Sequence, residues 1–267
     1  MRKFFLFIII VASAACIITA QSRCEEGNTK ALAKGKTADV ETRTKSETSS
    51  SKVQPKGKTA SVEAQPKGKT LSATAQQLAK AGYVNIQDAD PSIHVSLMYA
   101  RADNFTGALR EAYLHPKAAT ALVKAQRRLK QLRPDLSLKV YDAARPMHIQ
   151  QKMWDAVKNT SKDIYVSNPA HGGGMHNYGL AVDITLCDAK GDTLDMGTKI
   201  DYMGRAAHID AEQQLVASHR ISRQALRNRQ LLREVMRYAG YRALRTEWWH
   251  FNLVSRATAK KYYKAIR

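Results

Sequence analysis

Three segments of the chain carry apolar residues at the three- and four-residue spacing of an amphipathic helix. The first covers about 118–132 and is closed by Pro134. The second is predicted to begin at Pro146, a residue that suits the first helical position. The third runs from about 222 to 239, and Gly240 after it is typical of a helix C-terminus.

Shorter apolar runs between these segments are typical of strands. They cover 138–142, 181–186 and 248–254, and a glycine-rich loop from His171 to His176 precedes the second run. Helices and strands follow one another without a regular alternation. The sequence therefore predicts an α+β domain.

The first 20 residues have the pattern of an export signal. Arg2 and Lys3 precede an apolar run, and small residues follow it. A membrane-spanning helix needs about 20 apolar residues, so this stretch is borderline for a span, and we expect a cleaved signal. The sequence Ser-Ala-Ala-Cys16 would also suit lipoprotein processing. We therefore expect an exported protein, either in the periplasm or anchored to a membrane through Cys16.

Residues 21–75 are predicted to be a disordered linker. They are rich in Lys, Thr and Ser, and an 11-residue repeat covers 54–64 and 65–75. With almost no large apolar side chain, this stretch cannot bury enough surface to offset its chain entropy. The remaining residues, 76–267, suit one compact domain. Only Cys187 lies in that domain, so we expect a small core residue there and no disulfide or cysteine metal site.

The net charge is +20, of which residues 1–75 carry +7 and residues 76–267 carry +13. For an exported protein this charge favours contact with peptidoglycan or an anionic envelope surface, in particular through the basic linker. Nucleic-acid binding is not predicted, because no basic run is interleaved with aromatic residues. The sequence leaves the oligomeric state open. Six arginines recur at spacings that suit the exposed face of one helix: Arg220, Arg223, Arg227, Arg229, Arg233 and Arg237.

Two segments concentrate side chains that bind metals. His176 lies in the glycine-rich loop, and Asp183 lies inside an apolar strand, where an ionised carboxylate is destabilising unless a cation or another positive partner is present. Glu247 and His250 bracket two tryptophans at the start of the last strand. Residues three apart on a regular strand face opposite sides, so only one of these two is expected to be a ligand unless a bulge intervenes. A catalytic zinc ion takes three such ligands and keeps a fourth position for water.

Five motifs occur in an order that resembles a known family, the VanX-type D-alanyl-D-alanine dipeptidases. These are zinc D,D-peptidases that share a fold with the Hedgehog signalling domain. The resemblance covers about 99–254 and implies one zinc domain with a central, mostly antiparallel sheet flanked by helices. The motifs are Asp103-Asn-Phe-Thr-Gly107, Tyr141-Asp-Ala-Ala-Arg145-Pro146, His176-x-x-Gly179-x-Ala181-x-Asp183, Asp195-Met-Gly-Thr-x-x-Asp201 and Glu247-Trp-Trp-His250.

The resemblance also implies a role for individual residues. His176, Asp183 and His250 would bind one Zn²⁺ per chain. Glu247 would be the catalytic base, and Arg145 would bind the developing oxyanion.

Substrate contacts are implied for a further three positions. Asp201 would face the ammonium group of a small dipeptide, and Tyr178 and Gly174 would lie beside the substrate. Gly174 stands where relatives of this type have Ser, so a hydroxyl that would help to hold the substrate amino terminus is missing. We expect a supporting or surface role for His171.

The expected function is zinc-dependent hydrolysis of D-alanyl-D-alanine, or of a similar short D-amino-acid dipeptide, in peptidoglycan turnover or glycopeptide resistance. One alternative is a D,D-carboxypeptidase that acts on peptidoglycan stem peptides and needs an open cleft. Another is a wall-binding zinc module without activity. Glu247 argues against the second alternative, because a structural zinc site needs no base.

Overall fold

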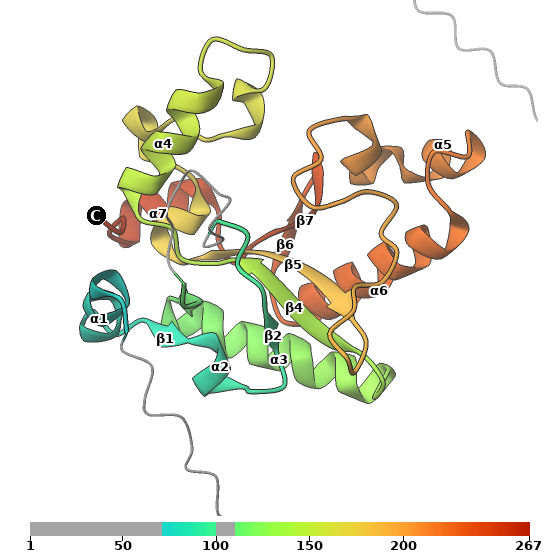
Figure 1. Ribbon diagram of the computed structural model, residues 1–267, viewed down its shortest axis with the longest axis horizontal. Helices are drawn as coiled ribbons and strands as arrows, with labels where there is room; N and C mark the ends of the chain where they lie inside the picture. The colour runs from blue at the N-terminus through green and yellow to red at the C-terminus, as the bar shows by residue number, and fades with distance from the viewer. Residues whose placement is uncertain (1–70, 100–109) are drawn as a thin grey trace, which may run out of the picture. The chain divides into compact units, whose positions relative to one another are not determined.

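The computed structural model of the protein describes residues 71–99 and 110–267 (Figure 1). The predicted signal, most of the predicted linker and the motif from Asp103 to Gly107 lie outside the described residues. Helix α1 (Ala73–Lys80) extends across the predicted domain boundary at residue 76. The Ser72 hydroxyl accepts a hydrogen bond from the Ala75 amide, and Ala75 is fully buried, so ordered structure begins before that boundary.

A five-stranded, mostly antiparallel sheet forms the centre of the fold. Only the edge pair β2–β4 is parallel, and a separate two-stranded sheet joins β1 (Val84–Asn85) and β3 (Tyr113–Leu114). These features confirm the α+β class. The order across the main sheet is β2 (His94–Val95), β4 (Ser137–Asp142), β5 (Ala181–Cys187), β7 (Glu247–Asn252) and β6 (Arg242–Leu244).

Two long helices, α3 (Pro116–Leu132) and α6 (Arg223–Tyr238), lie against one face of this sheet (Figure 1). The main core lies between them and the sheet, where Val182 and Ile184 of β5 are fully buried with apolar residues of both helices. Ser222 caps the start of α6, and Gly240, at φ 99°, follows its end as predicted. Both predicted helices are confirmed.

The shorter helices surround the rest of the sheet. Helix α4 starts one residue after Pro146, which is its N-cap. No helix within 71–99 or 110–267 is long and apolar enough to cross a membrane. The helices are α2 (Ile86–Ala89), α4 (Met147–Val157), α5 (Glu212–Ala217) and α7 (Arg256–Tyr262), together with 3-10 turns at Asp163–Tyr165, Pro169–His171, Met175–Tyr178, Arg205–Ala207 and Ile209–Ala211.

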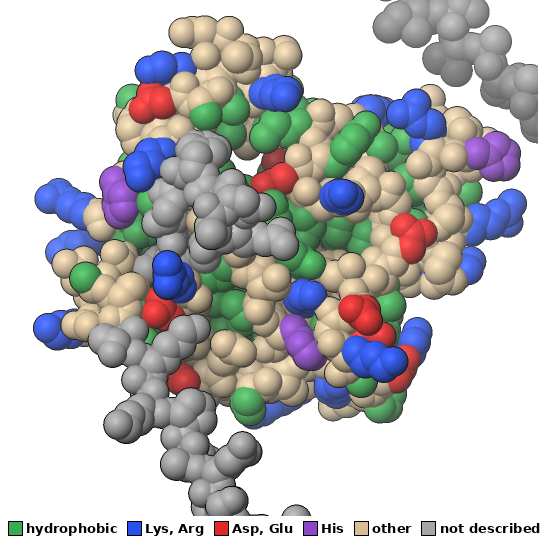
Figure 2. All heavy atoms as spheres, in the orientation of Figure 1, with side chains coloured by type: hydrophobic (Ala, Val, Ile, Leu, Met, Phe, Trp, Pro, Cys, Tyr) green, Lys and Arg blue, Asp and Glu red, His purple; other side chains and the backbone are tan. Residues whose placement is uncertain are grey.

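The arginines of α6 do not all face solvent, and the expectation was wrong for Arg229. Its side chain is fully buried, donates hydrogen bonds to Met196 O (2.7 Å) and Ala206 O (2.9 Å), and lies 3.7 Å from the Glu212 carboxylate. These partners come from segments distant in sequence, so helical spacing alone could not indicate them. On the face shown in Figure 2, Lys and Arg side chains are scattered within the face and around its margin and do not gather at one place.

Candidate metal centre and active site

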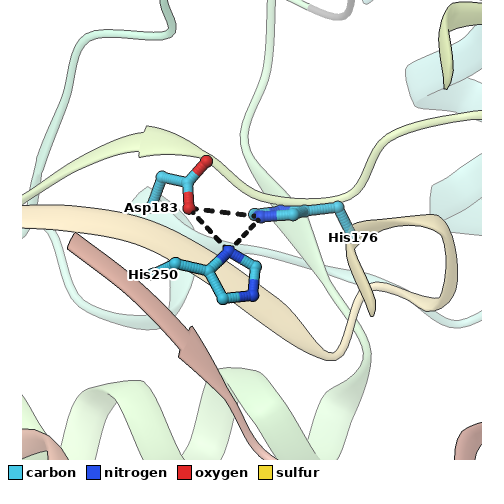
Figure 3. A group of neighbouring side chains, drawn as sticks. All are labelled: His176, Asp183 and His250. Carbon is cyan, nitrogen blue, oxygen red and sulfur yellow. Dashed lines mark hydrogen bonds and ion pairs between the residues drawn. The ribbon is translucent and has the colours of Figure 1, made fainter. Parts of the chain in front are cut away.

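Three predicted ligands meet on the sheet face opposite α3 and α6. Asp183 of β5 and His250 of β7 are direct cross-strand partners, so the register places them side by side. The turn Met175–Tyr178 brings His176 to the same place. One atom of each side chain points to a common centre (Figure 3): His176 Nε2 lies 3.2 Å from His250 Nδ1 and 3.3 Å from Asp183 Oδ1, and the latter two lie 2.9 Å apart.

These separations fit a tetrahedral metal ion. Ligand atoms about 2.0 Å from a tetrahedral centre lie about 3.3 Å from one another. The three atoms therefore form one face of a coordination tetrahedron and leave a fourth position open. Among the described residues, this trio is the one His, Cys, Asp and Glu group whose atoms lie close enough to hold a metal ion.

Hydrogen bonds behind the ligands fix which ring nitrogen faces the centre. His176 Nδ1 donates to Ala143 O at 2.8 Å, and His250 Nε2 donates to the side-chain oxygen of Asn252 at 2.8 Å. With a proton on the outer nitrogen, each ring turns its inner nitrogen toward the centre as a possible metal ligand. Two ring nitrogens and a carboxylate oxygen therefore converge, and this arrangement requires positive charge, which a metal ion or a proton on a ring nitrogen supplies.

The electrostatics of the trio are consistent with this requirement. Burial lowers the pKa of His250, but the hydrogen bond and negative charge of Asp183 outweigh burial and raise it to about 9. Burial also acts to raise the pKa of Asp183, yet the two histidines hold it well below its ordinary value. Asp183 is therefore an anion that attracts positive charge to this point.

Glu247 lies beside the trio because strand β7 is irregular. The pairing of β6 with β7 shifts between Ala243 and Leu244, and Leu244 pairs directly with Glu247. This irregularity allows Glu247 and His250 to line one pocket, with Glu247 Oε2 at 4.0 Å from His250 Nδ1. Burial raises the pKa of Glu247 to about 7, and the charge of His250 only partly opposes it. A carboxyl group with this pKa exchanges protons near neutral pH.

Arg145 is held on another side of the pocket by a buried network. Its guanidinium pairs with Asp142 through Nε (3.0 Å) and Nη2, and Nη1 donates to Gln150 Oε1 at 2.9 Å. Burial alone would lower its pKa, but Asp142, Tyr99 and Asp183 raise it above the ordinary value. Arg145 is thus a fixed cation that lines the same pocket as His176, Asp183 and His250.

Asp201 lines this pocket as well. Its carboxylate accepts a hydrogen bond from the Tyr99 hydroxyl at 2.5 Å, and the Tyr99 ring lies 5.0 Å from the Arg145 guanidinium. Burial and the charge of Asp183 raise the pKa of Asp201 to about 6. Its φ of 61° lies in the left-handed region. Helix α6 holds the preceding loop, since Asn228 Nδ2 donates to Asp195 O (2.8 Å) and Arg229 Nε donates to Met196 O.

The pocket that collects these groups has a volume of about 380 Å³. Charged groups of both signs face it, and Met153, Tyr165 and Trp249 contribute apolar walls. A pocket of this size suits a small, zwitterionic ligand.

Comparison with known proteins identifies the family. The peptidase M15 family model, described as D-Ala-D-Ala dipeptidase, matches residues 79–267. This chain belongs to the peptidase M15 family. The D-alanyl-D-alanine dipeptidase of Escherichia coli K12 is 36% identical to it over 173 residues, which cover 63% of this chain and 82% of that protein.

More distant relatives carry the same name. The D-alanyl-D-alanine dipeptidase of Enterococcus faecalis is 24% identical over 201 residues, 68% of this chain and 96% of that protein. The one from Synechocystis is 27% identical over 173 residues, 53% of this chain and 69% of that protein. All site residues described above, from Tyr99 to Asn252, lie within the family match. The chain is therefore a peptidase.

Tyr178 is the predicted site residue of this M15 peptidase that does not line the pocket. Its ring is buried in the main core, and its hydroxyl donates to Gly172 O at 3.0 Å. The prediction of a substrate contact is corrected to a structural role in holding the glycine-rich loop. His171 in that loop is exposed and does not line the pocket, and Cys187 is fully buried in β5.

Gly174 does line the pocket, and a neighbour fills the space beside it. A Cβ atom at residue 174 would lie 3.0 Å from Ser167 Oγ. Sequence reasoning missed Ser167, and it also missed Tyr99, Gln150 and Asn252. Each acts through a contact that only the fold creates. The role of Asp142 could have been predicted, because it precedes Arg145 by three residues in the motif that runs from Tyr141 to Pro146.

Proposed function

We propose that this M15 peptidase hydrolyses D-alanyl-D-alanine with the help of one Zn²⁺ ion. The observation that carries the proposal is the meeting of His176, Asp183 and His250 at tetrahedral spacing beside Glu247 and Arg145 in one pocket. The names of the relatives support the substrate. The donor set of two imidazoles and one carboxylate is a common ligand set of catalytic zinc. We also propose that the sheet and its flanking helices share the Hedgehog and D,D-peptidase fold.

When bound, a zinc ion lowers the pKa of a coordinated water towards about 7 and polarises the peptide carbonyl. Glu247 would accept a proton from the attacking water, because its own pKa of about 7 lets it exchange protons near neutrality. The water oxygen would bond to the peptide carbonyl carbon while the carbonyl oxygen takes the negative charge, and Arg145, held by Asp142 and Gln150, would donate hydrogen bonds to that oxygen. Glu247 would then deliver the proton to the nitrogen of the leaving amine as the carbon–nitrogen bond breaks.

Asp201 gives the pocket its preference for a free amino terminus. The carboxylate is fixed by Tyr99 and lies within the same pocket as the metal-binding trio, so it pairs with the ammonium group of a short substrate. A longer peptide presents an uncharged amide at that position and leaves Asp201 buried without a cation. A dipeptide is therefore preferred over a stem peptide.

We further propose that the peptidase works in the cell envelope, in peptidoglycan turnover. Support comes from the basic residues Arg2 and Lys3 before an apolar run, and from the basic linker, which is attracted to anionic envelope polymers.

The test measures how much D-alanine the full chain releases from D-alanyl-D-alanine and, in a parallel assay, from a stem pentapeptide. We expect cleavage of the dipeptide, loss of activity with a chelator and recovery with zinc. A preference for the pentapeptide would support a carboxypeptidase instead. Glu247→Ala is expected to remove activity and keep the zinc content, whereas a wild-type chain that binds zinc and cleaves neither peptide would contradict the proposal.

A further inference from the structure

Ser167 lies in the pocket, in the loop between the 3-10 turns Asp163–Tyr165 and Pro169–His171. The buried side chain of Gln150 holds it there. Gln150 Nε2 donates to Ser167 O at 2.8 Å, and Gln150 Oε1 accepts from Arg145 Nη1 at 2.9 Å. The backbone of Ser167 is therefore fixed relative to the Arg145 guanidinium through a single amide side chain.

The side chain of Ser167 takes up the space beside Gly174. A Cβ atom at residue 174 would lie 3.0 Å from Ser167 Oγ and 3.3 Å from Ser167 Cβ, closer than most contacts of real side chains. The backbone of Gly174, at φ −101°, does not need glycine for conformational reasons. Glycine at residue 174 leaves space for the Ser167 hydroxyl.

This hydroxyl is available to a ligand. In the part of the chain that the structure describes, the hydrogen bonds of Ser167 use its backbone carbonyl and none uses Oγ. Ser167 is partly buried. A ligand that displaces water from a polar group in a pocket wall binds more tightly when it forms a hydrogen bond with that group. Ser167, Gly174 and His176 line the same pocket.

We propose that Ser167 is a substrate-binding residue of this peptidase: its hydroxyl, in the space left by Gly174, hydrogen-bonds a charged end of the bound dipeptide. The proposal rests on the proposed function. A hydroxyl accepts a hydrogen bond from an ammonium group and donates one to a carboxylate, and these are the two charged ends that a dipeptide presents.

The first test compares Ser167→Ala with Ser161→Ala, which removes an exposed hydroxyl from the same segment outside the pocket. We expect Ser167→Ala to raise KM for D-alanyl-D-alanine roughly tenfold or more with little change in kcat, because a hydrogen bond to a charged group is lost equally from the ground and transition states. The dissociation constant of the dipeptide, measured by calorimetry with Glu247→Ala as background, is expected to rise by the same factor. Ser161→Ala is expected to match wild type in both measurements.

The second test exchanges the two side chains. Gly174→Ser alone is expected to weaken dipeptide binding, because its Cβ crowds Ser167. The double variant Ser167→Gly, Gly174→Ser restores a hydroxyl to the same space and is expected to recover most of the lost affinity. The proposal would be overturned if wild type and Ser167→Ala bound the dipeptide with equal affinity. It would also be overturned if the double variant had the thermal midpoint of wild type but bound the dipeptide as weakly as Ser167→Ala.

Two substrate analogues identify the contacted end. N-propanoyl-D-alanine lacks the amino group, and D-alanyl-D-alanine amide lacks the carboxylate. The effect of Ser167→Ala on affinity is expected to vanish for the analogue that lacks the contacted group; an effect that persists undiminished with both analogues would contradict a contact to either end. If wild type neither binds nor cleaves D-alanyl-D-alanine, the proposed function itself has failed, which the wild-type control shows separately.

Discussion

Replacing Glu247 by Gln is expected to abolish activity and at the same time to stabilise the metal-free protein. The substitution keeps the shape of the side chain and removes its charge. Burial raises the pKa of Glu247 from its ordinary 4.5 to about 7, so the folded protein disfavours the ionised form. At 1.36 kcal/mol per pH unit, this shift corresponds to about 3 kcal/mol of lost stability once the group is fully ionised.

The sign of the effect sets its pH dependence. Below about pH 4.5 Glu247 is protonated in both the folded and the unfolded chain, and it contributes no penalty. The penalty grows as pH rises from 4.5 to about 7 and is constant above that range. Glutamine carries no charge at any pH. The gain in the free energy of unfolding from Glu247→Gln is therefore expected to be near zero at pH 4 and largest at pH 8.

Thermal unfolding of the chelator-treated proteins measures this difference. For a domain of this size, about 3 kcal/mol corresponds to a rise of roughly 6–12 °C in Tm. Ser161→Ala serves as a control for an exposed polar side chain and is expected to leave Tm unchanged at both pH values. A Glu247→Gln protein that is no more stable than wild type at pH 8, or equally stabilised at pH 4 and pH 8, would show that burial of the Glu247 charge does not destabilise the fold.

Three further predictions concern Arg145, Arg229 and removal of the metal ion. Arg145→Lys keeps the charge but loses the planar fork that holds Asp142 and Gln150, so kcat for the dipeptide is expected to fall roughly 100- to 1000-fold in steady-state assays. Arg229→Ala is expected to destabilise the protein by about 3–5 kcal/mol in urea unfolding because it leaves buried carbonyls without a donor, whereas the exposed Arg227→Ala changes stability by less than about 0.5 kcal/mol. Chelation is expected to remove activity and lower Tm, and added zinc to restore both in the same scan.

The fold class and the candidate metal ligands could be predicted from the amino-acid sequence. Helical spacing located α3 and α6, and an acidic residue inside an apolar strand indicated that Asp183 needs a cation. Those signals are local, because periodicity and the burial of a charge are visible within a few residues. The roles of Glu247 and Arg145 came from motif order, and the structure brings both to one pocket with the trio.

Contacts between distant segments could not be predicted from the sequence and became visible in the folded chain. Helical periodicity placed Arg229 on the solvent-exposed face, yet its side chain is buried and bonds to carbonyls that lie 33 and 23 residues earlier in the chain. Motif position put Tyr178 beside the substrate, yet packing directs its hydroxyl to Gly172. Ser167 fills the space beside Gly174, although each residue alone looks unremarkable in sequence. The physical reason is the same in each case: a side chain's partners depend on distances between segments that chain order does not specify.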